Sequence, residues 1–338
     1  MIVTAGLFFG TLWVLFLVTY SWTYTPLGRL DYQAAVISRL AKWNQKPVEI
    51  SREARERFRS SRFSFGLFFG EVEGVRVLDI VIPRPDGSGL PARVYAPLSQ
   101  EKLPVFLDIH GGSWFMGDGY PLDNVNSNLA KEARVIVVAI EYRLVPEHPY
   151  PAALEDSVLS LDWLAENAES IGGDTSKIAV GGGSAGGNLA AALTIHARDN
   201  NGPEIAFQFL FVPATDLSDK TSWQSYKEMG DSYMLKVSDI GLIIDAYIPN
   251  SVDRYTPYAS PLLADRFEGL PPAFIVTAQF DPLRDQGEAY ARALSGAGVK
   301  VQLRREDSAV HAFIGSKERM RNVYKELAAN LREAFSGE

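Results

Sequence analysis

One serine of this sequence stands in a turn motif that is typical of a nucleophile. The segment GGSAG at 182–186 matches GxSxG and lies between a short apolar run and an alanine-rich stretch. Between a strand and a helix, such small neighbours let the chain turn sharply and present the hydroxyl of Ser184. A glycine-rich turn can also pack a helix closely on a sheet or bind phosphate. No lysine follows the turn, which excludes the phosphate-binding loop.

A serine hydroxyl needs a base, and the histidines restrict where that base can be. The chain has four histidines and no cysteine, so disulfides, thiolate nucleophiles and cysteine-bound zinc are excluded. Only His196 and His311 follow Ser184, as the order of a hydrolase triad requires. His196 lies about 18 Å along the same predicted helix, too far to reach the hydroxyl. His311 is therefore the predicted base, and His110 and His148 are interpreted as structural.

The acid that orients His311 should lie at the end of another strand. Asp281 directly follows the apolar run at 273–280. Asp216, after the preceding strand, and Asp285 are rivals, since either carboxylate could instead cap a helix or form a surface ion pair. Position along the chain favours Asp281.

Acyl transfer also needs N–H donors for the oxyanion, and the loop HGGSW at 110–114 follows a predicted strand. The predicted donors are the backbone N–H groups of Gly112, Ser113 and Ala185. Three further residues are predicted to support the site: His110, Gly111 and Asp285.

Alternating strand and helix patterns position these residues. Strands are expected at 75–82, 92–96, 105–110, 135–140, 178–180, 205–212, 273–277 and 299–304, the first two as a hairpin. Helices are expected at 151–166, 185–198, 288–294 and 317–335. This alternation predicts an α/β fold with a mainly parallel eight-stranded sheet, helices on both faces, and chemistry beyond the carboxyl ends of the strands. The base would follow the last strand through a short loop at 306–310.

The same patterns divide the chain into domains. About sixty residues separate the strands that end near 212 and begin at 273, too many for a bare loop. A helical insertion at 219–249 and a helical, charged pattern at 31–62 are expected to form a cap. The predicted cap comprises 25–70 and 215–250, and the predicted catalytic domain comprises 71–214 and 251–338.

The N-terminus differs from the rest of the chain. Residues 1–28 carry no charged side chain, and 2–22 are largely Leu, Phe, Val, Trp and Tyr. That length can span a bilayer, and no signal-peptide features are clear. Residues 1–24 are thus predicted to be a single-pass membrane anchor that contacts lipid through 2–22. Basic residues follow this apolar run but do not precede it, which favours the cytoplasmic side for the catalytic domain. The alternative to an anchor is a helix that packs on the protein's own surface or mediates dimerisation.

Composition limits the partners. The chain has 338 residues, 46% of them hydrophobic, which is enough for a large globular core. Its formal net charge is −8, with the basic residues scattered, so nucleic acid is excluded as a partner. No metal or cofactor is implied.

Together these motifs closely resemble those of the hormone-sensitive-lipase-like esterases, the bacterial family IV group that includes arylacetamide-deacetylase-like proteins. The motifs are HGGSW at 110–114, EYRLVPEHPYPAALED at 141–156, GGGSAGGNLAAAL at 181–193, YASPLLAD at 258–265, FDPLRDQGEAYARAL at 280–294 and HAF at 311–313. The resemblance implies an α/β-hydrolase fold with a helical cap and a Ser184, Asp281, His311 triad. The chain departs from the family at Ser113, where the third glycine of HGGG is usual, and at Gly183, where Asp or Thr is usual.

The function that follows is that of a lipolytic serine carboxylesterase, which cleaves short- to medium-chain carboxylic esters through an acyl-enzyme. Candidate pocket residues under the cap are Trp114, Phe115, Tyr142, Trp223, Tyr226 and Leu283. A membrane-associated deacetylase or lipase is the alternative enzyme, and a non-catalytic small-molecule receptor on the hydrolase fold is the alternative from another class. A homodimer is compatible with the resemblance.

Overall fold

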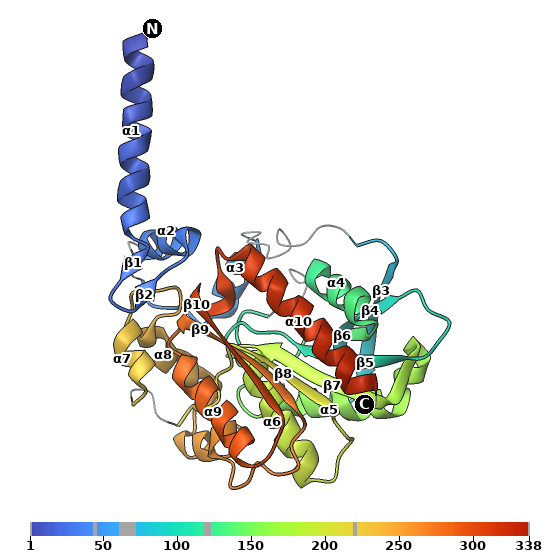
Figure 1. Ribbon diagram of the computed structural model, residues 1–338. Coiled ribbons are helices and arrows are strands. Elements are labelled where there is room, and N and C mark those ends of the chain that lie inside the picture. Colours follow the sequence, from blue (N-terminus) through green and yellow to red (C-terminus); the bar gives the residue numbers. More distant parts are fainter. Residues whose placement is uncertain (1, 43–45, 61–71, 118–122, 219–221, 337–338) are drawn as a thin grey trace.

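An eight-stranded sheet forms the centre of the protein (Figure 1). The structure is a computed structural model and describes residues 2–42, 46–60, 72–117, 123–218 and 222–336. The strands are β3 (Val75–Pro83), β4 (Gly89–Pro97), β5 (Leu103–Ile109), β6 (Ile136–Ile140), β7 (Gly173–Gly183), β8 (Phe207–Phe211), β9 (Ala273–Phe280) and β10 (Val301–Val310). Their order is β10-β9-β8-β7-β5-β6-β4-β3.

The sheet is parallel from β6 to β10 and antiparallel at its other edge. Strand β4 pairs antiparallel with both β3 and β6, and the remaining pairs are parallel. The predicted α/β sheet, its hairpin and its strand number are confirmed. Parallel strands bring their carboxyl ends to one edge, so the residues after β5, β7, β9 and β10 lie close together.

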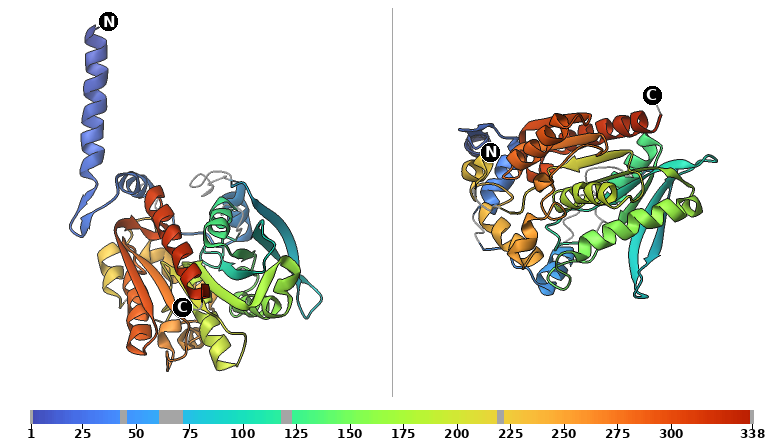
Figure 2. Two further views of the ribbon diagram at one scale, coloured as in Figure 1. Left: turned by 45° about the vertical axis from the view of Figure 1, so that its right-hand side comes forward. Right: turned by 90° about the horizontal axis from the view of Figure 1, so that it is seen from below.

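Helices cover both faces of the sheet (Figures 1 and 2). In β5, Val105, Leu107 and Ile109 belong to one buried cluster and Phe106 to another, because successive side chains of a strand point to opposite faces. The first cluster includes residues of α5 (Ala152–Asn167), α6 (Ala185–Asp199) and α9 (Arg284–Gly296). The second includes residues of α4 (Asp123–Ala133) and α10 (Lys317–Ser336). Short 3₁₀ helices are η3 (Ala168–Ile171), η4 (Ser251–Tyr255), η5 (Pro261–Leu263) and η6 (His311–Phe313).

Two segments that are far apart in the sequence supply further helices. The first gives α2 (Tyr32–Ala41) and α3 (Arg52–Ser60), and the second gives α7 (Gln224–Met229) and α8 (Val237–Tyr247). The two segments meet where Val48 N–H donates to Asp239 Oδ1 at 3.0 Å. The residues predicted for the cap at 43–45, 61–70 and 219–221 lie outside the described residues.

Two local predictions are wrong, and one helix was not predicted. The helical pattern at 31–62 is interrupted between α2 and α3 around Pro47, which has no N–H to donate. The loop expected at 306–310 is the end of β10, which continues past a register shift to pair Val310 with Phe280. Helix α4 was missed because its sequence is mostly polar; it buries Val125, Leu129, Ala130 and Ala133 on one side.

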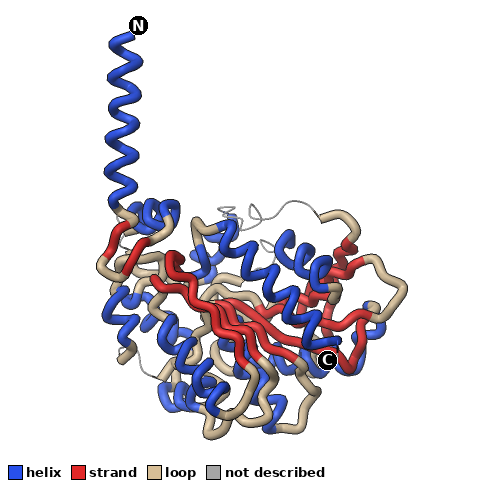
Figure 3. Tube along the Cα trace, viewed as in Figure 1, coloured by secondary structure: helices blue, strands red, loops and turns tan. Residues whose placement is uncertain are grey.

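The N-terminal helix α1 (Ile2–Ser21) stands away from the rest of the molecule (Figures 1 and 3, and the left view of Figure 2). At its base, β1 (Tyr24–Thr25) and β2 (Gly28–Arg29) form a small antiparallel hairpin that leads into α2. Among the described residues, no helix combines the length and the apolar character needed to cross a membrane.

Candidate active site

Ser184 occupies a strained turn between β7 and α6. Its φ of 55° and ψ of −114° lie outside the regions that L-residues usually adopt. The turn is possible because its glycines touch backbone: a Cβ on Gly186 would lie 1.9 Å from the carbonyl oxygen of Ile109, and one on Gly182 would lie 2.3 Å from the same atom. Asn188 ties the start of α6 to the carbonyl oxygens of Ala214 and Ala259, each at 2.8 Å. Together these contacts hold the serine hydroxyl at the carboxyl edge of the sheet.

The three residues proposed from the sequence for nucleophile, base and acid meet in one hydrogen-bonded chain. His311 Nε2 lies 3.0 Å from Ser184 Oγ, and His311 Nδ1 lies 2.8 Å from Asp281 Oδ2. Asp281 is fully buried, and its Oδ1 accepts from the N–H of Leu283 at 2.9 Å. This arrangement can remove the proton from the serine hydroxyl and stabilise the imidazolium that forms.

The segment that carries His311 is also strained. Ala312 and Phe313 have φ values of 58° and 52°, in the left-handed region that costs non-glycine residues energy. Phe313 is buried, and its ring packs edge-on against Phe211 at 4.8 Å. The strain persists because packing on both sides of this turn fixes the backbone.

The rival residues have other partners. Asp216 Oδ1 accepts from both the N–H and the hydroxyl of Ser218, at 3.0 and 2.5 Å. His196 lies beside Tyr258 at the far end of α6, with ring centroids 5.4 Å apart. Neither contacts the chain of hydrogen bonds at Ser184.

The HGGSW loop lies against the nucleophile turn. A Cβ on Gly111 would lie 2.7 Å from the carbonyl oxygen of Gly183 and 3.6 Å from Ser184 Cβ. The next residues, Gly112 and Ser113, have φ values of 104° and 57°. Ser113 thus has a left-handed conformation at the position where the family usually has glycine. Ala185 is the first residue of α6, so its N–H points out of the helix N-terminus, where negative charge is stabilised.

His110 supports the HGGSW loop through contacts with Gly111 and Tyr142. Its Nδ1 lies 2.7 Å from the carbonyl oxygen of Gly111, and its ring stacks on Tyr142 with centroids 4.1 Å apart. The hydroxyl of Tyr142 donates to the carbonyl oxygen of His110 at 3.0 Å. Tyr142, which is predicted to line the pocket, is therefore a buried residue that packs against the HGGSW loop and holds it in place.

The other pocket candidates are mostly buried too. Trp114 is 3% exposed and stacks on Tyr247 of α8 with centroids 4.2 Å apart. Tyr226 accepts a hydrogen bond from Gln286 Nε2 at 2.9 Å. Phe115 and Leu283 are buried within the core, and Trp223 is half-buried against it.

Helix α7 is clamped to the loop that carries the acid, a feature that the sequence did not indicate. Asp285 accepts from the N–H of Ser225 at 2.7 Å, and the Ser225 hydroxyl donates to the carbonyl oxygen of Pro282 at 2.5 Å. Arg284 pairs with Glu228 of α7 at 2.8 Å and donates to the Gln279 carbonyl oxygen at 3.1 Å. Asp285 is predicted to support the site, and the structure shows that it contacts α7.

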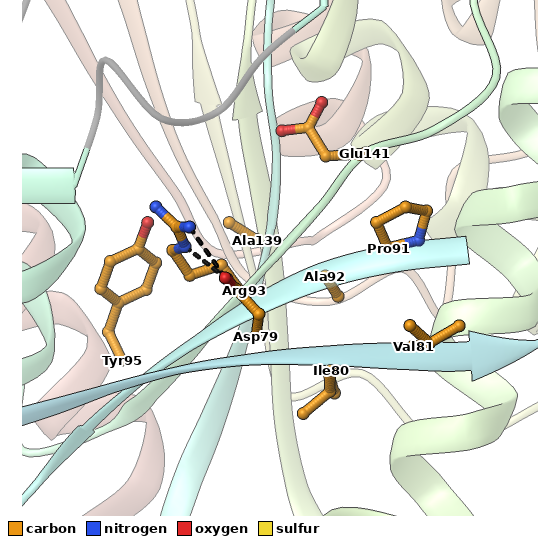
Figure 4. A pocket seen from close by; sticks show the side chains of 9 residues that line it. All are labelled: Asp79, Ile80, Val81, Pro91, Ala92, Arg93, Tyr95, Ala139 and Glu141. Carbon is orange, nitrogen blue, oxygen red and sulfur yellow. Dashed lines mark hydrogen bonds and ion pairs between the residues drawn. The ribbon is translucent and has the colours of Figure 1, made fainter. Parts of the chain in front are cut away.

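A hollow of about 170 Å³ lies on β3, β4 and the end of β6 (Figure 4). It is lined by Asp79, Ile80, Val81, Pro91, Ala92, Arg93, Tyr95, Ala139 and Glu141. The Arg93–Asp79 ion pair crosses it and lowers the pKa of Asp79 through a side-chain hydrogen bond. None of these nine described lining residues is a serine or a histidine.

Comparison with known proteins agrees with this geometry. A family model described as alpha/beta hydrolase fold matches residues 106–315. The chain belongs to this family. Carboxylesterase NlhH of Mycobacterium tuberculosis is 43% identical over 229 residues, which are 67% of this chain and 71% of that protein. The arylesterase of Saccharolobus solfataricus is 38% identical over 252 residues, which are 73% of this chain and 80% of that protein.

Solved structures give the same result. An esterase of Pyrobaculum calidifontis superposes on this hydrolase with a TM-score of 0.79 at 35% identity, over 87% of this chain and 97% of that one. The resemblance to the hormone-sensitive-lipase-like esterases is confirmed, and the protein is a carboxylic ester hydrolase of the α/β-hydrolase fold.

Proposed function

We propose that this hydrolase cleaves short- to medium-chain carboxylic esters, with Ser184 as nucleophile, His311 as general base and Asp281 as the orienting acid. The single observation that carries the proposal is the continuous chain of hydrogen bonds from Asp281 Oδ2 to Ser184 Oγ. Ser184 Oγ attacks the ester carbonyl carbon while His311 Nε2 takes its proton. The same proton then passes to the departing alcohol, and water releases the acid from the acyl-enzyme.

The oxyanion of each tetrahedral intermediate is assigned to three N–H groups, those of Gly112, Ser113 and Ala185. The contact between Gly111 and the nucleophile turn supports this assignment, because it brings the loop beside Ser184. Amide donors that are fixed before the reaction stabilise developing charge without reorganisation.

The test is release of p-nitrophenol from acetate, butyrate, octanoate and palmitate esters in detergent near neutral pH. We expect turnover of the shorter esters by the wild type and a loss of about a thousandfold or more in Ser184→Ala. Turnover that survives in Ser184→Ala would remove the serine from the mechanism. Ligand binding without turnover by either protein would favour the receptor interpretation. Faster cleavage of the matching anilides would favour a deacetylase, and a maximum at palmitate would favour a lipase.

We also propose that helix α1 attaches the protein to membrane lipid through residues 2–22. Residues 12–18 are 42–63% exposed, and the helix has neither acidic residues in its first turn nor basic residues in its last. At its base, the Arg29 guanidinium lies over the rings of Tyr20 and Tyr24, at 5.2 and 5.4 Å. Aromatic and cationic side chains gather at this level of a membrane interface. The single-pass anchor and the cytoplasmic catalytic domain stay predictions from the sequence. The homodimer stays an implication of the family resemblance.

Flotation with phosphatidylcholine vesicles tests the attachment. The full chain is expected to float with the vesicles, whereas a chain that lacks residues 2–18 is expected to stay at the bottom of the gradient. A full chain with Val14→Asp and Val18→Asp is the matched control, because it keeps the length of the helix and should also fail to float. Equal flotation of all three proteins would sink the proposal.

A further inference from the structure

The segment that follows helix α1 packs against the strands that carry the acid and the base. Six buried side chains form one cluster there: Leu30, Ala34, Ala35, Met229, Phe280 and Val310. Phe280 directly precedes Asp281, and Val310 directly precedes His311. The cluster that contains Leu30 therefore includes the residues that directly precede two members of the proposed triad.

Two hydrogen bonds fasten this segment to the same two strands. The N–H of Asp31 donates to the carbonyl oxygen of Ser308 in β10 at 2.9 Å. Gln279 Nε2, in β9, donates to the carbonyl oxygen of Leu27 at 3.3 Å. The segment thus binds β9 and β10 within three residues of the acid and the base.

The start of α2 also rests on the chain just beyond the base. Gly315 has a φ of 82°, and a Cβ at this position would lie 2.8 Å from the backbone nitrogen of Ala34. Between Val310 and Gly315 lies the strained turn of His311, Ala312 and Phe313. The N-terminal segment therefore contacts the chain on both sides of that turn.

We propose that residues 27–35 are a positioning element for His311 and Asp281, with Leu30 as its central side chain. Leu30 touches no reacting atom; it acts by fixing the ends of β9 and β10, and so the distances on which proton transfer depends. Displacement of a catalytic group by about 1 Å is enough to cost up to a hundredfold in rate. The inference rests on the esterase activity of the protein and adds a role for a segment outside the catalytic domain.

The experiment compares Leu30→Ala with Leu129→Ala in the full chain. Both leucines are buried, at 3% and 2% exposure, but Leu129 lies in α4, within the cluster that includes α10. Kinetics with p-nitrophenyl butyrate are measured in detergent, at a temperature where thermal unfolding shows each protein folded. We expect Leu30→Ala to lower kcat about tenfold with little change in KM, Leu30→Met to restore most of it, and Leu129→Ala to leave kcat unchanged.

A double-mutant cycle separates positioning from a general structural effect. In an Asp281→Asn background the base has lost its orienting carboxylate, so Leu30→Ala should lower the residual kcat by less than about twofold. Leu30→Val serves in the same cycle if Leu30→Ala does not fold. An unchanged kcat in the folded variant, an equal effect in both backgrounds, or an equal loss in Leu129→Ala would overturn the proposal. Absent turnover by the wild type would instead contradict the esterase function.

Discussion

The nucleophile half of the active site and its acid–base half are held in place by different means. Ser184 sits at the centre of the sheet, where glycine backbone of β7 and α6 touches the carbonyl oxygen of Ile109. Asp281 and His311 sit after β9 and the edge strand β10, supported by side chains from the N-terminal segment and from α7. Close backbone contacts around Ser184 cannot accommodate an added atom, whereas a substitution can weaken the side-chain packing around Asp281 and His311 gradually. The two halves should therefore respond differently to substitution.

The largest effect is expected at Gly186. A methyl group there would lie 1.9 Å from the Ile109 carbonyl oxygen and 2.5 Å from that of His110, so α6 or the HGGSW loop would have to move. We expect Gly186→Ala to lose more than about a hundredfold in kcat/KM for p-nitrophenyl butyrate, or to fail to fold. Gly296→Ala is the control, because nothing lies within 4 Å of its added Cβ. Near-normal activity of Gly186→Ala would break the comparison.

A smaller effect is expected at Arg284, on the acid–base side. Its side chain is 8% exposed and joins Glu228 of α7 to the backbone of Gln279. Arg284→Met keeps most of the apolar stem but removes these two contacts and the ion pair with Asp285, so α7 should loosen and kcat should fall about three- to tenfold. Arg266→Met, which removes an ion pair from an exposed arginine, should leave kcat unchanged. A loss as large as that of Gly186→Ala would show that both halves are equally rigid.

The smallest effect on catalysis is expected at Asp108, a side chain of β5 on the nucleophile side. Burial raises the pKa of this carboxyl to about 6, although Asn126 donates to it at 3.0 Å. Because the folded state holds the proton more tightly than the unfolded state, this carboxyl stabilises the fold less as pH rises toward 6. At pH 8 the free energy of unfolding of Asp108→Asn should therefore exceed that of the wild type by about 2 kcal/mol, which raises its unfolding temperature. At pH 4 the two proteins should differ little. Its kcat should stay unchanged.

Asp86→Asn is the control for this pH dependence. Hydrogen bonds from Ser88 lower the pKa of the exposed Asp86 carboxyl, so this carboxyl stabilises the fold more, not less, as pH rises. Asp86→Asn should therefore gain no stability at pH 8. A gain at pH 8 in both variants would show that removal of negative charge, rather than burial of Asp108, sets the effect.

The sequence by itself determined the residues that carry the chemistry and the kind of sheet that presents them. Short motifs placed Ser184, His311 and Asp281 at the ends of three predicted strands, and the alternation of strands and helices indicated a mainly parallel sheet. These signals are local: a nucleophile turn needs small residues beside the serine, and a buried strand needs a continuous apolar run. For that reason the sheet, the family and the ester hydrolase function follow from the amino-acid sequence alone.

Only the tertiary structure decided what holds those residues in place. The cluster that contains Leu30, Phe280 and Val310, the stacking of Trp114 on Tyr247 and the pairing of Arg284 with Glu228 join parts of the chain that are distant in sequence. One such link, from Gln279 to Leu27, spans 252 positions. Contacts of this kind leave no periodicity and no motif in the sequence, because each of these side chains could contact many other residues and only the folded chain selects its partner.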